Sequence, residues 1–128
     1  MKKFGDIFVL DVGDDIERDQ YFADKIVVIF TVFPHPERVW PAGDYRLRDT
    51  CNEEKEQFLK LGVLTDEVLA SLTDVKICAK IAAEYSDLDK AIAVFEVMKS
   101  YGIADISLYH QGTLVENYEG YADEGSGS

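Results

Sequence analysis

The clearest pattern of apolar and polar positions lies between residues 74 and 118. From 75 to 85 the odd positions are all apolar or aromatic, whereas Lys76, Lys80 and Glu84 occupy even positions. Because successive side chains of a strand point to opposite faces, a period of two indicates a strand with one apolar face. We therefore predict a strand over 75–85 that contacts a core on one side and water on the other.

The residues that follow predict a helix and a hairpin. Apolar side chains recur three or four positions apart, which is the spacing of one helical face: Leu88, Ala91, Ile92, Phe95 and Met98. Ser86 or Asp87 can cap the helix, and Gly102 can adopt the left-handed conformation that ends it. A strand over 103–110, a turn at Gln111 and Gly112, and a returning strand over 114–118 complete the unit. A helix of this length between two strands allows a parallel crossover over the sheet.

Two earlier segments have the composition of buried strands. Residues 7–10 form a short apolar run. Residues 25–33, KIVVIFTVF, are rich in β-branched and aromatic side chains and apolar at both parities. We expect 25–33 to lie mid-sheet, with both faces covered by its own chain or with one face turned to a partner. Pro34 and Pro36 end this strand, since proline donates no backbone hydrogen bond.

The region between the strands predicts two extended pieces and two helices. Residues 37–48 suggest short extended pieces around a turn at 41–44, PAGD. Residues 52–61 predict a helix that is capped by Thr50 or Asn52 and ends at Gly62. A second short helix is expected over 66–72, beginning at Thr65.

Together these elements predict an α+β fold. We expect one domain over residues 1–120, with a mainly antiparallel sheet of four to six strands and two or three helices packed on one face. The helix over 87–101 is the main cover and the pair over 52–72 flanks it. Residues 121–128 lack apolar periodicity and predict a flexible tail, whose last four residues, GSGS, have the composition of an added linker.

Charge is distributed unevenly along the chain. The net charge is −12 over 128 residues. Residues 4–24 hold seven acids and one base, and residues 100–128 hold five acids and neither lysine nor arginine. Such a field repels nucleic acid and anionic membranes and attracts a basic protein. The alternative interpretation is that acidity simply keeps a small protein in solution.

The location expected from the sequence is cytoplasmic. Apolar runs are shorter than the roughly 18 residues that a membrane helix needs. The basic start is followed by Gly5, Asp6 and Asp11, which interrupt the apolar core of a signal peptide. Without a secretion signal, Cys51 and Cys78 are expected to be reduced thiols.

An acidic cluster follows the first buried strand and consists of Asp11, Asp14, Asp15, Glu17 and Asp19. Its carboxylate oxygens are ligands of the kind that bind Mg²⁺ or Ca²⁺. Counted from Asp15, however, position six is Gln20 and position twelve is Ile26, where a calcium loop has glycine and glutamate. We favour solvated loop acids here and expect neither a metal nor a cofactor.

Other candidate chemistry is sparse. His35 and His110 are each possible general bases, and His110 with Cys51 or Cys78 would make a thiol pair, but ordinary surface histidines are the favoured interpretation. Arg38, Arg46 and Arg48, near Trp40 and Tyr45, suggest a platform for a small anion or nucleotide. The alternative for this arginine patch is an internal, salt-bridged pair of strands.

Tyrosines accompany the acids in both acidic segments, a composition suited to protein interfaces. The candidate partner-binding residues are Asp11, Asp14, Asp15, Glu17, Asp19, Tyr21, Tyr109, Glu116, Tyr118 and Glu119. We predict a small acidic protein-binding module rather than an enzyme, which inhibits or neutralises a basic partner such as a nuclease, toxin or nucleic-acid-binding protein. The alternative is a metal- or nucleotide-dependent enzyme or ligand binder that uses the carboxylates at 11–19 or the arginine patch.

Overall fold

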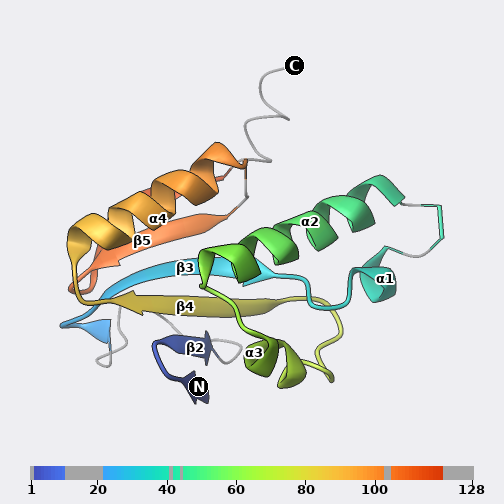
Figure 1. Ribbon diagram of the computed structural model, residues 1–128, viewed down its shortest axis with the longest axis horizontal. Coiled ribbons are helices and arrows are strands. Elements are labelled where there is room, and N and C mark those ends of the chain that lie inside the picture. Colours follow the sequence, from blue (N-terminus) through green and yellow to red (C-terminus); the bar gives the residue numbers. More distant parts are fainter. Residues whose placement is uncertain (1, 11–21, 41, 44, 103–104, 120–128) are drawn as a thin grey trace.

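The computed structural model describes residues 2–10, 22–40, 42–43, 45–102 and 105–119 (Figure 1). Within these ranges the chain forms one six-stranded sheet and four helices. The strands are β1 (Lys2–Phe4), β2 (Ile7–Leu10), β3 (Ile26–Val32), β4 (Ala79–Tyr85), β5 (Ile106–His110) and β6 (Thr113–Tyr118). The helices are α1 (Pro36–Val39), α2 (Tyr45–Leu61), α3 (Asp66–Ala70) and α4 (Leu88–Ser100). The predicted α+β fold with an antiparallel sheet is confirmed, whereas the predicted tail over 121–128 lies outside the described residues.

The strand order is β1-β2-β4-β3-β5-β6, and every neighbouring pair is antiparallel. Because β3 lies between β4 and β5, those two strands run parallel to each other. Helix α4 connects them, so the expected crossover is present with one strand inserted between its ends. This arrangement places β3 in the middle of the sheet, as its apolar sequence predicts.

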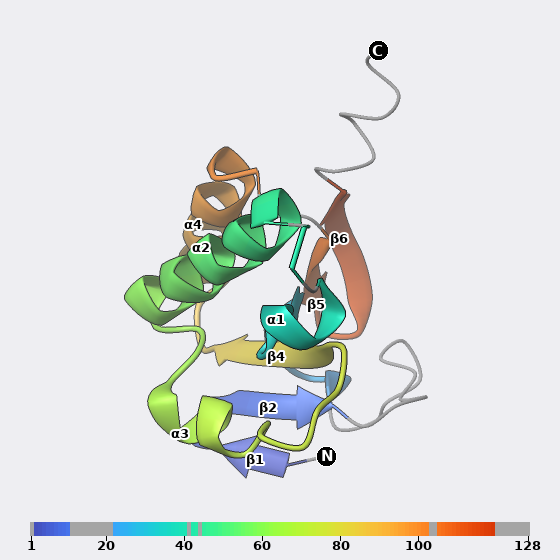
Figure 2. The same ribbon diagram turned by 90° about the vertical axis from the view of Figure 1, so that its right-hand side faces the viewer.

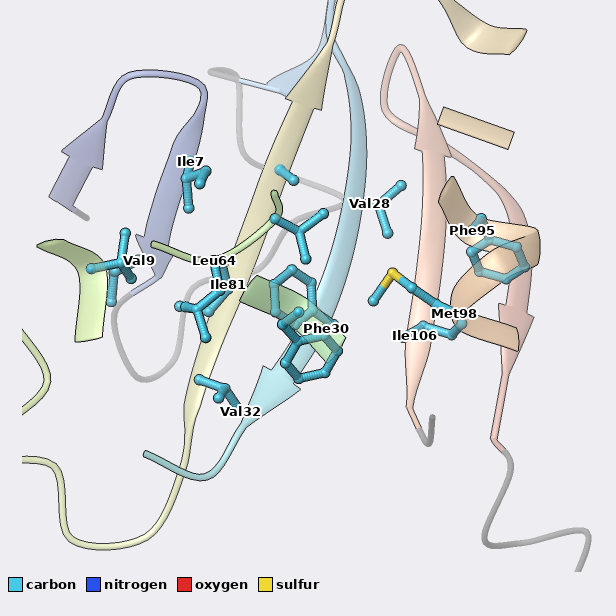
Figure 3. Close-up of a cluster of buried hydrophobic side chains, with 14 of the residues drawn as sticks. Ile7, Val9, Val28, Phe30, Val32, Leu64, Ile81, Phe95, Met98 and Ile106 are labelled. Atoms are coloured by element: carbon cyan, nitrogen blue, oxygen red, sulfur yellow. The ribbon is translucent and has the colours of Figure 1, made fainter. Parts of the chain in front are cut away.

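The helices lie on one face of the sheet, and Figure 2 shows α2 and α4 together on that side. The register explains which side chains meet them, since Val28 pairs with Ala83 and Phe30 pairs with Ile81. These residues and their neighbours form the larger core (Figure 3). Its members from the strands include Ile7, Val9, Val28, Phe30, Val32, Ile81, Ala83, Ile106 and Leu108, and its members from the helices are Phe58, Val68, Ala91, Phe95 and Met98.

A second, smaller core covers the opposite face of the sheet. It contains Phe8, Leu10, Phe22, Val27, Ile29 and Ala82, with Tyr109 packed against it. Phe22 comes from the segment before β3, and its ring meets that of Phe8 edge-on with 5.6 Å between centroids. Ala82 of β4 is fully buried, which corrects the expectation that this strand meets water on its second face. The reason is the strand order: β4 pairs with both β2 and β3, so Phe8 and Ile29 flank Ala82.

The predicted caps of α3 and α4 are present, whereas Thr50 and Asn52, predicted to cap the helix over 52–61, lie inside α2. The Thr65 hydroxyl accepts a hydrogen bond from the Val68 amide at 3.2 Å, and the Asp87 carboxylate accepts one from the Asp89 amide at 2.9 Å. Gly62 and Gly102 follow α2 and α4 with φ of 78° and 72°. Glycine adopts this left-handed conformation at the least steric cost, so these positions end their helices as expected.

The expectation of extended structure over 37–48 is wrong. Pro36 begins α1, where its fixed φ suits the first helical position. Helix α2 begins at Tyr45, seven positions before the predicted start at 52, and its Arg48 guanidinium lies 4.4 Å from the centre of the Tyr45 ring one turn earlier. The Pro41–Gly43 signal separates two helices rather than two strands, because proline and glycine interrupt either kind of element.

One strand boundary and one additional strand also differ from expectation. Strand β4 begins at Ala79 rather than at 75, and Ile77 is exposed. Residues before β4 are held instead by Arg38, whose guanidinium donates to the carbonyls of Thr73 and Val75 at 2.9 and 3.3 Å. Strand β1, which was not predicted, pairs with β2 through a turn in which Gly5 has a φ of 65°.

In the part of the chain that the structure describes, no helix has the length and apolarity required to cross a membrane.

Candidate functional site

Four of the ten predicted partner-binding residues lie together in the β5–β6 hairpin or directly after it. Tyr109 belongs to β5, Glu116 and Tyr118 belong to β6, and Glu119 follows β6. The other six lie outside the described residues: Asp11, Asp14, Asp15, Glu17, Asp19 and Tyr21. The β5–β6 hairpin, residues 106–119, is therefore the part of the predicted surface whose geometry is described.

The turn of the hairpin fixes its position on the sheet. Gln111 and Gly112 have φ of 52° and 82°, the pair of left-handed conformations that a two-residue turn with the right twist requires. The Gln111 amide also donates to the Lys25 carbonyl at 2.8 Å. A Cβ atom on Gly112 would lie 3.7 Å from the Ala23 Cα, so the turn rests directly on the chain that enters β3.

A β-bulge divides the hairpin side chains between the two faces of the sheet. Leu108 pairs with Glu116 and Tyr109 pairs with Leu114, so Val115 is an extra residue without an opposite partner on β5. Tyr109 packs against the smaller core, whereas Tyr118 packs against the larger core under the helices. The two tyrosines that the sequence suggested as joint anchors therefore lie on opposite faces.

The charge of Glu116 is compensated by a lysine from α4. The Lys99 Nζ atom lies 2.9 Å from the Glu116 Oε2 atom and 5.9 Å from the centre of the Tyr118 ring. The hydrogen bond and the charge of Glu116 raise the pKa of Lys99, because both favour its protonated form. Glu119 is exposed and accepts from the Asn117 amide group at 3.4 Å, while Asn117 accepts from the Ser107 hydroxyl at 2.8 Å.

Exposed apolar side chains lie beside these polar groups. Leu114 and Val115 of β6 are 44% and 50% exposed, and β6 is the last strand of the described sheet. The exposure of these two side chains was not predicted from the sequence. The available signal was their adjacency, because consecutive side chains of a regular strand cannot both enter the same core.

The arginine patch does not form a common platform. Arg38 is engaged with the carbonyls of Thr73 and Val75, Arg48 stacks on Tyr45, and Arg46 is exposed on α2. Trp40 lies against Phe33, with 4.9 Å between the ring centres. The alternative of a salt-bridged strand pair is wrong, since all three arginines are helical.

The histidines and cysteines occupy separate structural positions. The ring of His35 is hydrogen bonded through Nε2 to the Leu72 carbonyl at 2.9 Å, which connects α1 to the residues after α3. His110 ends β5 opposite Ile26. Cys51 is buried in α2, and Cys78 is exposed before β4. Over the described ranges, no three histidine, cysteine, aspartate or glutamate side chains gather closely enough to hold a metal ion.

Burial of Cys51 predicts a loss of stability at alkaline pH. Burial, with a smaller contribution from Glu54, raises the pKa of the Cys51 thiol from its ordinary value of 9.0 to about 11. The unfolded chain therefore ionises first, and the free energy of unfolding should fall as the pH rises from about 9 to about 11, by up to roughly 2 kcal/mol. Urea unfolding across this range measures the slope. Cys51→Ala should flatten it and Cys78→Ala should not; equal slopes for both variants would contradict the assignment.

Comparison with known proteins finds no matching family model, no matching curated protein and no matching solved structure. The class that the fold defines is thus a small α+β domain with helices on one face of an antiparallel sheet.

Proposed function

We propose that the protein is a small acidic binding module that inhibits or neutralises a basic protein partner in the cytoplasm, in the manner of an immunity or anti-defence protein. The partner class is a nuclease, a toxin or another nucleic-acid-binding protein, because such proteins carry the basic surfaces that an acidic module complements. Binding requires no cofactor and no chemical step in this proposal.

The observation that carries the proposal is the composition of the β5–β6 hairpin surface. Leu114 and Val115 are exposed on the last strand of the described sheet, and Val115 directly precedes Glu116, which is paired with Lys99. The sequence from 100 to 128 contains five acids and neither lysine nor arginine. Exposed apolar side chains bordered by acidic and tyrosine residues are the composition of an interface with a basic protein.

The second acidic segment supports the same partner chemistry. Residues 4–24 carry seven acids and one base, and five of these acids are candidate partner-binding residues. Two separated segments of one sign produce a field that raises the association rate of a basic protein, and salt weakens that field. The proposal therefore predicts binding whose association rate decreases as the ionic strength rises.

Affinity capture from native lysate at low salt tests this function, followed by kinetics with the purified captured protein. The variant Asp14→Asn, Asp15→Asn, Glu17→Gln should reduce the association rate about tenfold. A matched control neutralises three exposed acids of α2 instead: Asp49→Asn, Glu53→Gln and Glu56→Gln. The control has the same net charge and should associate almost as fast as the wild type.

Two results would contradict the proposal. One is retention of no basic protein by the wild type at low salt. The other is an association rate that stays constant as salt is added, since that would remove the electrostatic contribution.

A further inference from the structure

The two edges of the described sheet differ in how well they are protected. At one end, β1 has three residues and includes Lys2 and Lys3. At the other end, β6 has six residues, Thr113–Tyr118, and includes no lysine, arginine or proline. Short length and lysine are common ways in which proteins prevent an edge strand from pairing with another chain. By length and lysine content β1 is the better protected edge; β6 carries a bulge at Val115 but is regularly paired with β5 over residues 116–118.

The side chains of β6 indicate that its outer side meets another protein. Leu114 and Val115 are the two exposed aliphatic side chains of the strand, at 44% and 50%. A strand added to this edge would bury part of both, while its backbone would hydrogen bond along β6. The position of Val115 is set by the bulge, and the residues after it, Glu116 to Tyr118, return to regular pairing with Leu108 to Ile106.

The charge near this edge identifies the chemistry of the added strand. The stretch 105–119 contains three acids and neither lysine nor arginine, but Lys99 of α4 lies 2.9 Å from Glu116, and the Asp105 carboxylate accepts a hydrogen bond from the Thr31 hydroxyl of β3 at 3.3 Å. The attraction for a basic strand therefore comes from Glu119 and from the net charge of −12 of the whole chain. A second copy of the chain would bring its own acids against this edge, together with a further net charge of −12. A basic strand gains from this field, whereas a second copy is repelled by it.

We propose that the β6 edge takes up an extended, lysine- or arginine-bearing segment of the basic partner as a seventh strand. This inference rests on the proposed function and specifies how the partner binds. Backbone hydrogen bonds along residues 115–119 hold the segment, Leu114 and Val115 contact its apolar side chains, and its cationic side chains lie toward Glu119.

The test uses a peptide probe and therefore does not depend on identifying the partner. The probe is a capped octapeptide of alternating lysine and valine, titrated against the ¹⁵N-labelled full chain and followed by amide chemical shifts. Saturable shifts that concentrate at residues 113–119, at peptide concentrations up to roughly 1 mM, are the expected result. A control peptide has the same sequence but carries methyl groups on the backbone nitrogens that would face β6. It keeps its charge but loses the N–H groups that donate hydrogen bonds to β6, and it should bind at least about tenfold more weakly.

A matched pair of variants separates the edge from net charge. Val115→Lys places a lysine on the edge strand. Val97→Lys makes the same change on α4, where the Val97 side chain is 36% exposed. Both variants change the net charge equally. Val115→Lys should weaken peptide binding about tenfold, and Val97→Lys should weaken it less than about twofold.

The outcomes distinguish failure of this inference from failure of the proposed function. Absence of saturable binding, shifts centred away from β6, or equal losses for the two variants would each overturn the edge inference. If the edge inference fails in this way but a basic protein is captured from lysate, the proposed function is still supported. Sedimentation velocity without peptide gives one more outcome. If the wild type is a dimer and Val115→Lys is a monomer, the edge binds a second copy of the chain, and this result would also overturn the inference.

Discussion

Replacing Phe58 with alanine is expected to reduce the free energy of unfolding by about 3–5 kcal/mol. Phe58 is fully buried, and its ring centre lies 4.5 Å from that of Phe30 in the central strand. The substitution removes the contact between α2 and β3 and leaves a cavity that a packed core fills only partly. Alanine favours helix, so the loss is due to packing rather than to weaker helix formation. Urea or thermal unfolding measures it, with a decrease in Tm of roughly 10–20 °C.

Two further variants of α2 control this measurement. Leu47→Ala removes an aliphatic side chain that is 50% exposed on the same helix, and it should change stability by less than about 0.5 kcal/mol. Phe58→Leu keeps most of the buried volume and should lose about 1–2 kcal/mol. If Phe58→Ala and Leu47→Ala had equal effects, α2 would not be anchored on the sheet in the way described.

Replacing Phe8 with alanine is expected to cost about 3–4 kcal/mol, although Phe8 lies on the sheet face without helices. Phe8 is fully buried, and Phe22 covers it in an edge-on contact. A face open to water would make this substitution almost neutral, so the variant tests whether the smaller core is a true core. Equilibrium unfolding in urea gives the value, and a loss below about 1 kcal/mol would contradict burial of this face.

Phe22→Ala provides the partner measurement. It should cost a similar amount, since Phe22 is 1% exposed. A double-mutant cycle with Phe8→Ala should give a coupling energy of about 0.5–1.5 kcal/mol, the contribution expected of an aromatic pair beyond its buried area. Additive losses would show that the two rings are stabilised by separate contacts.

Elements with a strong local signal were predicted correctly from the sequence. The α4 helix was recognisable because its apolar face repeats with helical spacing, and Asp87 and Gly102 mark its ends. The β5–β6 turn was recognisable because Gln111-Gly112 is short and tolerates left-handed conformations. In each case the cause acts within about four residues along the chain, so it can be read without knowing the neighbours.

Residues 37–48 were misassigned because their local signals are ambiguous. Proline and glycine at 41–43 break either a strand or a helix, and short charged segments fit both. What decides the matter is tertiary: the Lys55 ammonium donates to the Pro34 carbonyl at 3.1 Å, and Cys51 and Phe58 of α2 enter the core. Arg38 similarly gains its role from contacts with Thr73 and Val75, about 35 positions further along the chain.

The candidate site was predictable in part, because some of its residues are brought together by local structure. Tyr109, Glu116 and Tyr118 were placed near one another because a short turn connects their strands. Their division between two faces was not predictable, since it depends on the bulge at Val115. The pairing of Glu116 with Lys99 was also hidden, because it requires α4 to lie over β6's neighbouring strand.

By itself, the sequence determined the type of most elements, the caps of α3 and α4, the hairpin turn and the acidic, tyrosine-bearing character of the chain. These properties follow from side-chain spacing, backbone conformational preference and charge, which are local. Only the tertiary structure decided the strand order, the burial of Ala82 on a second core, and the position of β6 as the last strand of the described sheet. Each of these depends on which strands pair across long separations in sequence, and that choice is made by the burial of the whole sheet rather than by any one segment.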